Sequence, residues 1–171
     1  FMHSLAFGTL LPFIPGEGET GVNAAQVAMT LDVMANSLVY WVQDLMAAGL
    51  LGPGSKVYAM TSAGGTRVVP AYGAVSAAKA ALESNIRQLS MELAPYGIAA
   101  NSIRAGVTDT PALRKIPGND RLVQGALAHN PSGRLTTVED VADHIVLLSA
   151  IDSHWMTGNV IGIDGGEDIT G

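Results

Sequence analysis

A tyrosine and a lysine seven residues apart, Tyr72 and Lys79, are the side chains of this sequence whose types and spacing best suit chemistry. Seven residues are nearly two helical turns, so both side chains return to one helix face, about 10 Å apart along the axis. A tyrosine hydroxyl can donate a hydrogen bond to an oxygen that gains negative charge. A nearby ammonium lowers the pKa of a phenol and can hold the hydroxyls of a ribose. Spacing alone leaves open that Tyr72 caps the helix and Lys79 lies on its solvated face.

These side chains belong to a predicted strand, loop and helix. The strand covers residues 56–61, and Ser62, ten residues before Tyr72, begins the loop. Pro70 precedes the helix, where its missing N–H costs little. The helix is predicted to run to about Ala94. Its apolar stripe consists of Val75, Ala78, Leu82, Ile86, Leu89 and Leu93.

Two further helices follow from apolar residues that recur at spacings of three and four. The first is predicted from about Asn23 to Gly49, with a stripe of Val27, Leu31, Met34, Leu38, Trp41 and Leu45. The second begins at a cap, Thr136 or Thr137, and ends near Ala150. Its predicted buried face consists of Val138, Val141, Ile145 and Leu148. Short helical pieces are expected at 111–115 and 119–129.

Strands are also predicted in residues 1–7, in 98–103 and, with an exit loop, in 160–166. Strands that alternate with helices through short connections favour a parallel α/β sheet. Such sheets bind ligands at the carboxyl ends of their strands. Polar or glycine residues follow each predicted strand, namely Ser4, Ser62 with Gly64, Gly106 with Thr108 and Thr110, and Gly165. We therefore expect the site at that edge.

Composition excludes several classes of function. The chain has 171 residues, 48% of them hydrophobic, and a net charge of −6. It is long enough for one domain with a substantial core, and it lacks the basic surface of a nucleic-acid-binding protein. Polar residues interrupt its longest apolar region, which argues against a membrane span. The absence of cysteine excludes disulfides and favours the cytoplasm. The histidines, His3, His129, His144 and His154, lack metal-ligand spacing, so we expect no metal site.

Four motifs resemble the short-chain dehydrogenase/reductase family. They are residues 60–64 (MTSAG), 76–82 (SAAKAAL), 101–106 (NSIRAG) and 157–166, which begins TGNV and ends DGG. The resemblance covers nearly the whole chain. It implies that residues 1–171 form a single domain with a Rossmann-like, doubly wound parallel sheet, of which the chain is the C-terminal two-thirds. No glycine-rich phosphate loop matches the family's pattern, so the N-terminal phosphate-binding βαβ part is expected to be absent.

The position of the tyrosine narrows this resemblance. Most family members carry it four residues before the lysine, where this chain has Val75. The Tyr-x6-Lys spacing resembles the enoyl-acyl-carrier-protein reductases of bacterial fatty-acid synthesis. Residues 2–8 (MHSLAFG), 105–110 (AGVTDT) and 131–136 (PSGRLT) also look like segments of that subfamily. Ser62 stands where ordinary dehydrogenases, and one branch of the enoyl reductases, carry serine.

The resemblance implies reduction of the trans-2 double bond of enoyl-acyl-carrier-protein thioesters by NADH or NADPH in fatty-acid elongation. The implied catalytic residues are Tyr72, Lys79 and Ser62. The implied cofactor contacts are Ser4, Thr61, Lys79, Ala105, Gly106, Val107 and Thr110. The implied substrate contacts are Phe7, Tyr72, Leu113, Ile116 and Leu122, the last three on a flap formed by residues 107–130, with Leu127 in the same apolar wall.

Several alternatives stay open. Thr110 could instead cap the turn after Pro111, and the apolar flap residues could be ordinary core. The enzyme could be another short-chain reductase that acts on a ketone or alcohol, or the chain could be an inactive fragment or scaffold. Family members are commonly tetramers, so the helices at 24–48 and 72–94 are expected to pair across a two-fold axis. No nucleic acid or membrane partner is expected.

Overall fold

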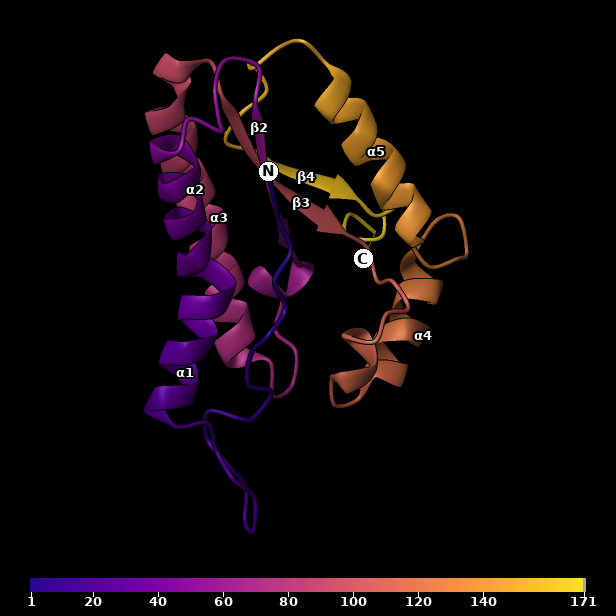
Figure 1. The fold of residues 1–171 in the computed structure, drawn as a ribbon. Helices are drawn as coiled ribbons and strands as arrows, with labels where there is room; N and C mark the ends of the chain where they lie inside the picture. Colours follow the sequence, from indigo (N-terminus) through magenta and orange to yellow (C-terminus); the bar gives the residue numbers. More distant parts are fainter. Residues whose placement is uncertain (171) are drawn as a thin grey trace.

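A four-stranded parallel sheet forms the centre of the computed structural model, which describes residues 1–170 (Figure 1). The strands are β1 (Met2–His3), β2 (Lys56–Thr61), β3 (Ala99–Ala105) and β4 (Val160–Ile163). They lie in the order β1-β2-β3-β4, and each neighbouring pair is parallel. The predicted parallel α/β sheet is confirmed.

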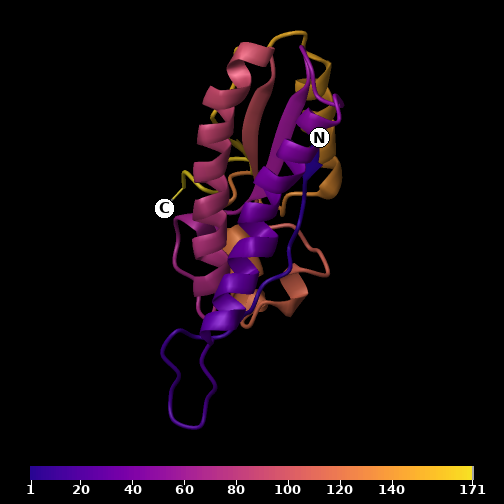
Figure 2. The same cartoon turned by 60° about the vertical axis from the view of Figure 1, so that its left-hand side comes forward.

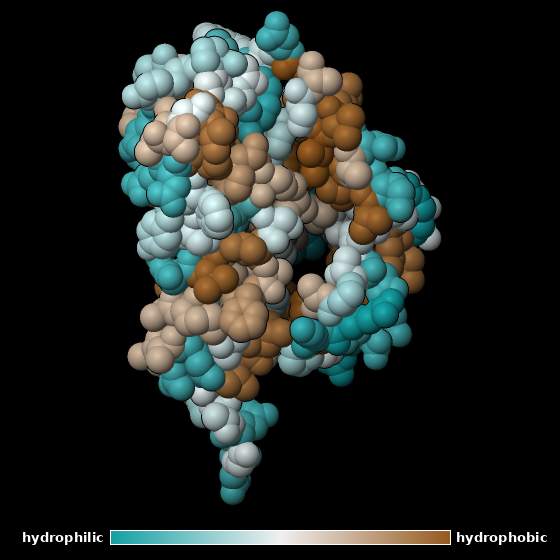
Figure 3. All heavy atoms as spheres, viewed as in Figure 1, coloured by the Kyte–Doolittle hydropathy of each residue, from teal (hydrophilic) through white to brown (hydrophobic). Residues whose placement is uncertain are grey.

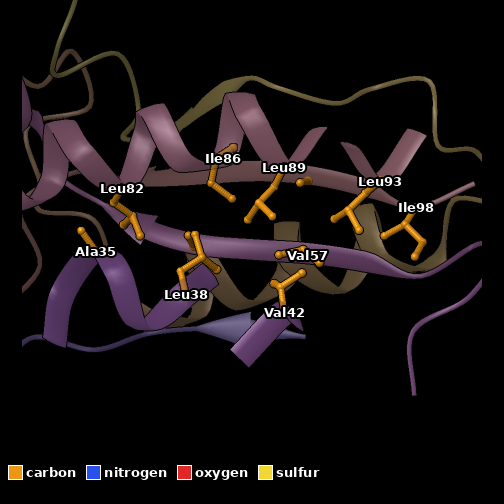
Figure 4. Packing of buried hydrophobic residues seen from close by; sticks show 11 residues of the cluster. Ala35, Leu38, Val42, Val57, Leu82, Ile86, Leu89, Leu93 and Ile98 are labelled. Carbon is orange, nitrogen blue, oxygen red and sulfur yellow. The ribbon is translucent and has the colours of Figure 1, made fainter. Parts of the chain in front are cut away.

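One helical layer consists of α1 (Ala24–Leu31), a π-helical turn (Asp32–Asn36), α2 (Ser37–Ala47) and α3 (Gly73–Leu93). Figure 2 shows α3 beside the continuous helix formed by α1, the π-helical turn and α2. All six predicted stripe residues of α3 are buried. Figure 4 shows four of them, Leu82, Ile86, Leu89 and Leu93, packed toward Val57 of β2 and the α2 side chains. The prediction for this helix is confirmed because its apolar spacing follows a regular α-helix.

The π-helical turn changes which residues of the first helix are buried. Trp41, which the regular stripe predicts to be buried, is 53% exposed, whereas Val42 is 2% exposed. A π-helical turn accommodates one extra residue in the helix. Met34 and Leu38 are buried as predicted, but the next core positions are one residue further along, at Val42 instead of Trp41 and at Met46 instead of Leu45. The prediction for Trp41 was therefore wrong.

The other helices are α4 (Asn119–His129) and α5 (Val138–Ala150), with 3₁₀ turns at Ala63–Gly65, Ala94–Tyr96 and Leu113–Lys115. Thr137 caps α5: its hydroxyl accepts the Asp140 N–H at 3.1 Å, and the Asp140 carboxylate accepts the Thr137 N–H at 2.8 Å. Of the predicted buried face, Val141 is buried, but Val138 is 57% exposed. Val138 precedes the first complete turn, and the residues that face the sheet are Val141, Ile145 and Leu148.

Both faces of the sheet are covered, as expected for parallel strands. Side chains alternate along a strand, so Val57, Ala59 and Ala100 face the layer with α3, whereas Tyr58 and Ile103 face α5. Figure 1 shows α1–α3 on one side of the sheet and α5 on the other. Because all four strands are parallel, the residues that follow β1, β2, β3 and β4 lie together at the carboxyl ends of the strands.

A search of residues 1–170 finds no helix with both the length and the apolar character needed to cross a membrane.

Candidate active site

The loop after β2 folds back onto the first turns of α3. Ser62 begins it and accepts the Gly64 N–H on Oγ at 3.1 Å. A Cβ atom added at Gly64 would lie 2.6 Å from Cε1 of Tyr72, and one added at Gly65 would lie 3.4 Å from Cβ of Lys79. The two glycines thus lie directly against the tyrosine ring and the lysine stem. This contact brings Ser62, Tyr72 and Lys79 close together.

Tyr72 is held as a neutral hydrogen-bond donor. Its ring packs against the cluster of Met34, Val75 and Ala78, and the residue before it, Ala71, has a left-handed φ of 58°. Burial raises the pKa of Tyr72 above its ordinary value, although a hydrogen bond with Ser62 opposes this. The hydroxyl therefore keeps its proton at neutral pH. Tyr72 occupies the N-cap position of α3, but its side chain makes no capping bond there.

Lys79 is buried, which excludes the alternative of a solvated helix face. Lys79 is only 6% exposed, and its Nζ donates to the Met60 carbonyl oxygen at 2.7 Å. Burial lowers the pKa of Lys79 to about 8, against the opposing effect of the Glu83 carboxylate. The group is thus still mainly charged at pH 7. An ammonium has three N–H donors, and Met60 accepts one of them.

Glu83 is a member of this site that the sequence reasoning missed. Its carboxylate accepts the hydroxyl of Thr61 at 2.6 Å, so the side chain of this predicted cofactor contact is engaged inside the protein. Glu83 lies four residues after Lys79, and residues four apart share a helix face. That spacing could have indicated from the sequence that Glu83 lies beside Lys79.

The loop after β3 is closely packed around Gly106. A Cβ atom added there would lie 2.3 Å from Oγ1 of Thr136, 3.0 Å from Oε2 of Glu167 and 3.1 Å from Cα of Asp164. The next N–H, that of Val107, donates to the Glu167 carboxylate at 3.1 Å, and the Val107 carbonyl accepts the Thr136 N–H at 3.2 Å. Ala105, the last residue of β3, packs against the core of the α5 face. Both backbone groups of Val107 are therefore bonded within the chain.

Gly106→Ala is expected to lower the free energy of unfolding by about 1–3 kcal/mol, because the methyl group would overpack this loop. Gly125→Ala is the matched control. It lies inside α4 with no atom within 4 Å of an added Cβ, and alanine is the better helix former by about 1 kcal/mol. Urea unfolding of both variants measures the contrast. Equal stability of the two variants would show that the space around Gly106 is not restrictive.

The segment after β1 lies close to the same site. His3 is buried, its Nε2 lies 2.8 Å from Oγ of Ser37, and burial, then the charge of Lys79, lowers its pKa. Ser4 and Phe7, by contrast, are exposed, Phe7 to 67%. Their side chains are accessible to a ligand at the carboxyl edge of the sheet.

The predicted flap lies on a separate lobe. Leu113, Ile116 and Leu122 are half-buried and Leu127 is exposed. Figure 3 shows a hollow between the layer of α1–α3 and the lobe that carries α4 and α5. Thr110 accepts the Leu113 N–H on Oγ1 at 3.2 Å, so it does cap the turn that follows Pro111. A polar cavity of about 360 Å³ elsewhere on this lobe is lined by Arg134, Asp140, His144 and Asp164 among others.

The sequence patterns also did not indicate four charged residues near the site: Arg67 after β2, Arg104 of β3, and the acids Glu167 and Asp168 of the last turn. Arg67 Nε and Arg104 NH2 lie 2.9 Å and 2.8 Å from the carboxylate oxygens of Asp168, and Glu167 binds the Val107 N–H. Arg67 and Asp168 are 101 residues apart. No local spacing indicates a pairing over such a distance.

Comparison with known proteins places these features in context. A family described as "Enoyl-(Acyl carrier protein) reductase" matches residues 1–167. The NADH enoyl-acyl-carrier-protein reductase FabI of Aquifex aeolicus is 32% identical over 170 residues, which cover 99% of this chain and 62% of the relative. A 1-cyclohexenylcarbonyl-CoA reductase of Streptomyces collinus is 34% identical over 125 residues, 72% of this chain and 45% of the relative.

A solved structure agrees with these relatives. The crystal structure of the Aquifex aeolicus reductase superposes with a TM-score of 0.87 at 31% identity and covers 99% of this chain and 65% of that one. The described chain therefore has the Rossmann-like fold of that structure. It spans somewhat less than two thirds of the length of these relatives.

Proposed function

The chain belongs to the enoyl-acyl-carrier-protein reductase family, and from this premise we propose that it reduces the trans-2 double bond of an enoyl thioester with a nicotinamide cofactor. The proposal extends to an acyl-carrier-protein-linked substrate in fatty-acid synthesis, since relatives carry that name. Tyr72, Lys79 and Ser62 are the proposed catalytic residues.

The observation that carries the proposal is the pair formed by Tyr72 and the buried Lys79. Val75, four residues before the lysine, is buried in an apolar cluster and can neither donate nor accept a proton. Tyr72 instead places its hydroxyl beside Ser62. A neutral hydroxyl in a partly buried site is well suited to donate to a thioester oxygen as that oxygen gains negative charge.

Lys79 is proposed to support the same reaction in two ways, through its N–H donors and through its positive charge. Among residues 1–170, the acceptor identified for its ammonium is the Met60 carbonyl, so two N–H donors are left for the ribose hydroxyls of a cofactor. Its positive charge also favours negative charge on a nearby oxygen. The bound cofactor would supply hydride to the double bond. These residues fit a nicotinamide nucleotide, NADH or NADPH.

The backbone of Val107 fits that group only after a rearrangement. Its N–H is held by Glu167, and a ligand that bonds there must first displace this carboxylate. We retain Ser4, Thr61, Ala105, Gly106, Val107 and Thr110 as proposed cofactor contacts. Two of their side chains, Thr61 and Thr110, already have partners inside the chain.

The acyl chain is proposed to lie in the hollow between the two lobes. Phe7 is exposed near one end of the site, and Leu113, Ile116 and Leu122 offer apolar surface on residues 107–130. A carbon chain removes apolar area from water when it enters such a surface, at about 25 cal/mol per Å².

A second candidate is reduction of a ketone, which the proximity of the Ser62 and Tyr72 side chains on either side of Gly64 favours. Each hydroxyl carries one proton, so both could donate to a ketone oxygen only after any bond between them has been given up. NADH and NADPH oxidation with crotonyl and with acetoacetyl thioesters distinguishes the two. We expect turnover of the crotonyl thioester; turnover of the acetoacetyl thioester alone would favour the second candidate, and none with either cofactor would contradict both.

A tetramer is the proposed assembly, and exposed apolar side chains on its helices support it. Tyr40, Trp41 and Met91 of α2 and α3 are all about half exposed or more. Light scattering measures the mass of the assembly directly. The cytoplasmic location expected from the cysteine-free sequence stays a prediction.

A further inference from the structure

The carboxylate of Asp168 lies between two arginines from different parts of the sheet edge. Arg67, in the loop after β2, contacts one oxygen through Nε at 2.9 Å, and Arg104, near the end of β3, contacts the other through NH2 at 2.8 Å. Arg67 NH2 also donates to the backbone carbonyl of Asp168 at 2.7 Å. The side chains of Asp168 and Arg104 are 17% and 23% exposed, which limits screening of their contact by salt, whereas Arg67 is half exposed.

The turn that carries Asp168 has its own internal support. The Asp164 carboxylate accepts the N–H groups of Gly166 at 3.0 Å and Asp168 at 3.3 Å. Asn130 donates to the Asp164 carbonyl at 3.0 Å. The neighbouring Glu167 holds the Val107 N–H. This turn can therefore serve as a fixed support for the loops that follow β2 and β3.

A short series of contacts leads from Asp168 to the tyrosine. The N–H of Arg67 donates to the Ala63 carbonyl at 2.8 Å, and that of Thr66 to the same oxygen at 3.0 Å. The next residue, Gly64, lies against the ring of Tyr72. Movement of Arg67 would therefore loosen the wall that buries the tyrosine.

We propose that Asp168 is a positioning residue of the active site: through Arg67 it holds the loop at 62–67 against Tyr72, and through Arg104 it fixes that loop relative to β3. The inference rests on the proposed function only in naming Tyr72 as the residue that donates to the substrate. Asp168 itself contacts neither Tyr72 nor Lys79 among the bonds of the described chain, so its effect passes through the loop.

The test compares the full chain with Asp168→Asn, which keeps the shape and removes the charge, and with Asp168→Glu, which restores the charge. Asp32→Asn is the matched control, because it removes one carboxylate from an exposed residue of the π-helical turn, where Asp32 accepts the Tyr40 hydroxyl. Two readouts report on the loop without any activity: amide hydrogen exchange at Thr66 and Arg67, and the titration of Tyr72 followed by NMR of ¹³C-labelled tyrosine.

In Asp168→Asn we expect about tenfold faster exchange at Thr66 and Arg67, the size of effect that follows from losing a charge-assisted hydrogen bond. We expect the pKa of Tyr72 to fall toward its ordinary value, since burial raises it in the parent, and kcat to fall more than KM rises. Asp168→Glu should recover part of each change, and Asp32→Asn should show none. Arg67→Gln, as a second variant, should reproduce the loop effects.

The proposal is overturned if Tyr72 titrates in Asp168→Asn as in the parent, or if exchange rises equally at core amides of β3, which would indicate only a global loss of stability. A different pattern would refute the proposed function instead: a parent chain that reduces no thioester while Asp168→Asn still changes both loop readouts. That pattern would support the positioning of Tyr72 by Asp168.

Discussion

Replacement of Tyr72 by phenylalanine is expected to lower kcat for crotonyl-thioester reduction by about 10²–10³-fold, the usual cost of removing one donor to a developing oxyanion. KM should change little, because the apolar ring keeps its contacts with Met34, Val75 and Ala78. Stability should also be retained, since only the hydroxyl next to Ser62 is lost. Steady-state kinetics with saturating NADH measures the effect.

Tyr96→Phe is the control for this change. Tyr96 is an exposed tyrosine just beyond the other end of α3, outside the site. Its loss of a hydroxyl should leave kcat and KM unchanged. Full activity of Tyr72→Phe would remove Tyr72 from the mechanism, and Ser62 would then be the hydroxyl to test.

Replacement of Lys79 by methionine is expected to lower kcat by about 10²-fold or more, because the site loses its fixed positive charge and the N–H donors proposed for ribose. The expected cofactor Kd rises as well. Methionine has a similar length and an apolar stem, so it can fill the buried position. Arg87→Met, at an exposed cation further along α3, is the control and should leave both constants unchanged.

The same variant has a distinctive effect on stability. Burial lowers the pKa of Lys79 from 10.5 to about 8, so the unfolded chain binds more protons than the folded one between these values. Stability of the parent therefore rises with pH across this window, by at most about 3 kcal/mol for a shift of this size. The cost of the buried charge is fully present below pH 8. Lys79→Met removes that cost and that part of the pH dependence.

Urea unfolding at pH 7 and pH 10 tests this. We expect Lys79→Met to be as stable as the parent, or more stable, at pH 7, and to show the smaller gain on going to pH 10. A parent whose stability falls over this range relative to Lys79→Met would contradict the assignment of a depressed lysine pKa. Activity and stability are thus expected to change in opposite directions, which distinguishes a functional charge from a structural one.

The sequence allowed the sheet and the helices to be predicted wherever one local pattern decides the outcome. The stripe of α3 was correct because its spacing follows a regular helix throughout. The predicted burial of Trp41 was wrong because the π-helical turn at Asp32–Asn36 changes which residues of α2 face the core. The sequence pattern carries no clear sign of that insertion. The predicted burial of Val138 was wrong because a residue directly after a helix cap need not face the core.

The site was predictable in part for the same reason. Ser62, Tyr72 and Lys79 belong to one strand, loop and helix, so their proximity follows from local structure. The partners supplied by the last turn, Glu167 and Asp168, come from a segment that reaches the site only through the order of the strands. Residue types alone cannot predict that Glu167 occupies the Val107 N–H.

The transfer of deuterium from a cofactor labelled at both C4 positions to a crotonyl thioester is the measurement that tests the account most directly. Mass spectrometry of the acyl product should show a saturated chain with one deuterium at C3. Tyr72→Phe should form this product far more slowly, with the label at the same carbon. A product that retains the double bond, a 3-hydroxy product from an acetoacetyl thioester alone, or label at no carbon would contradict the proposed reaction.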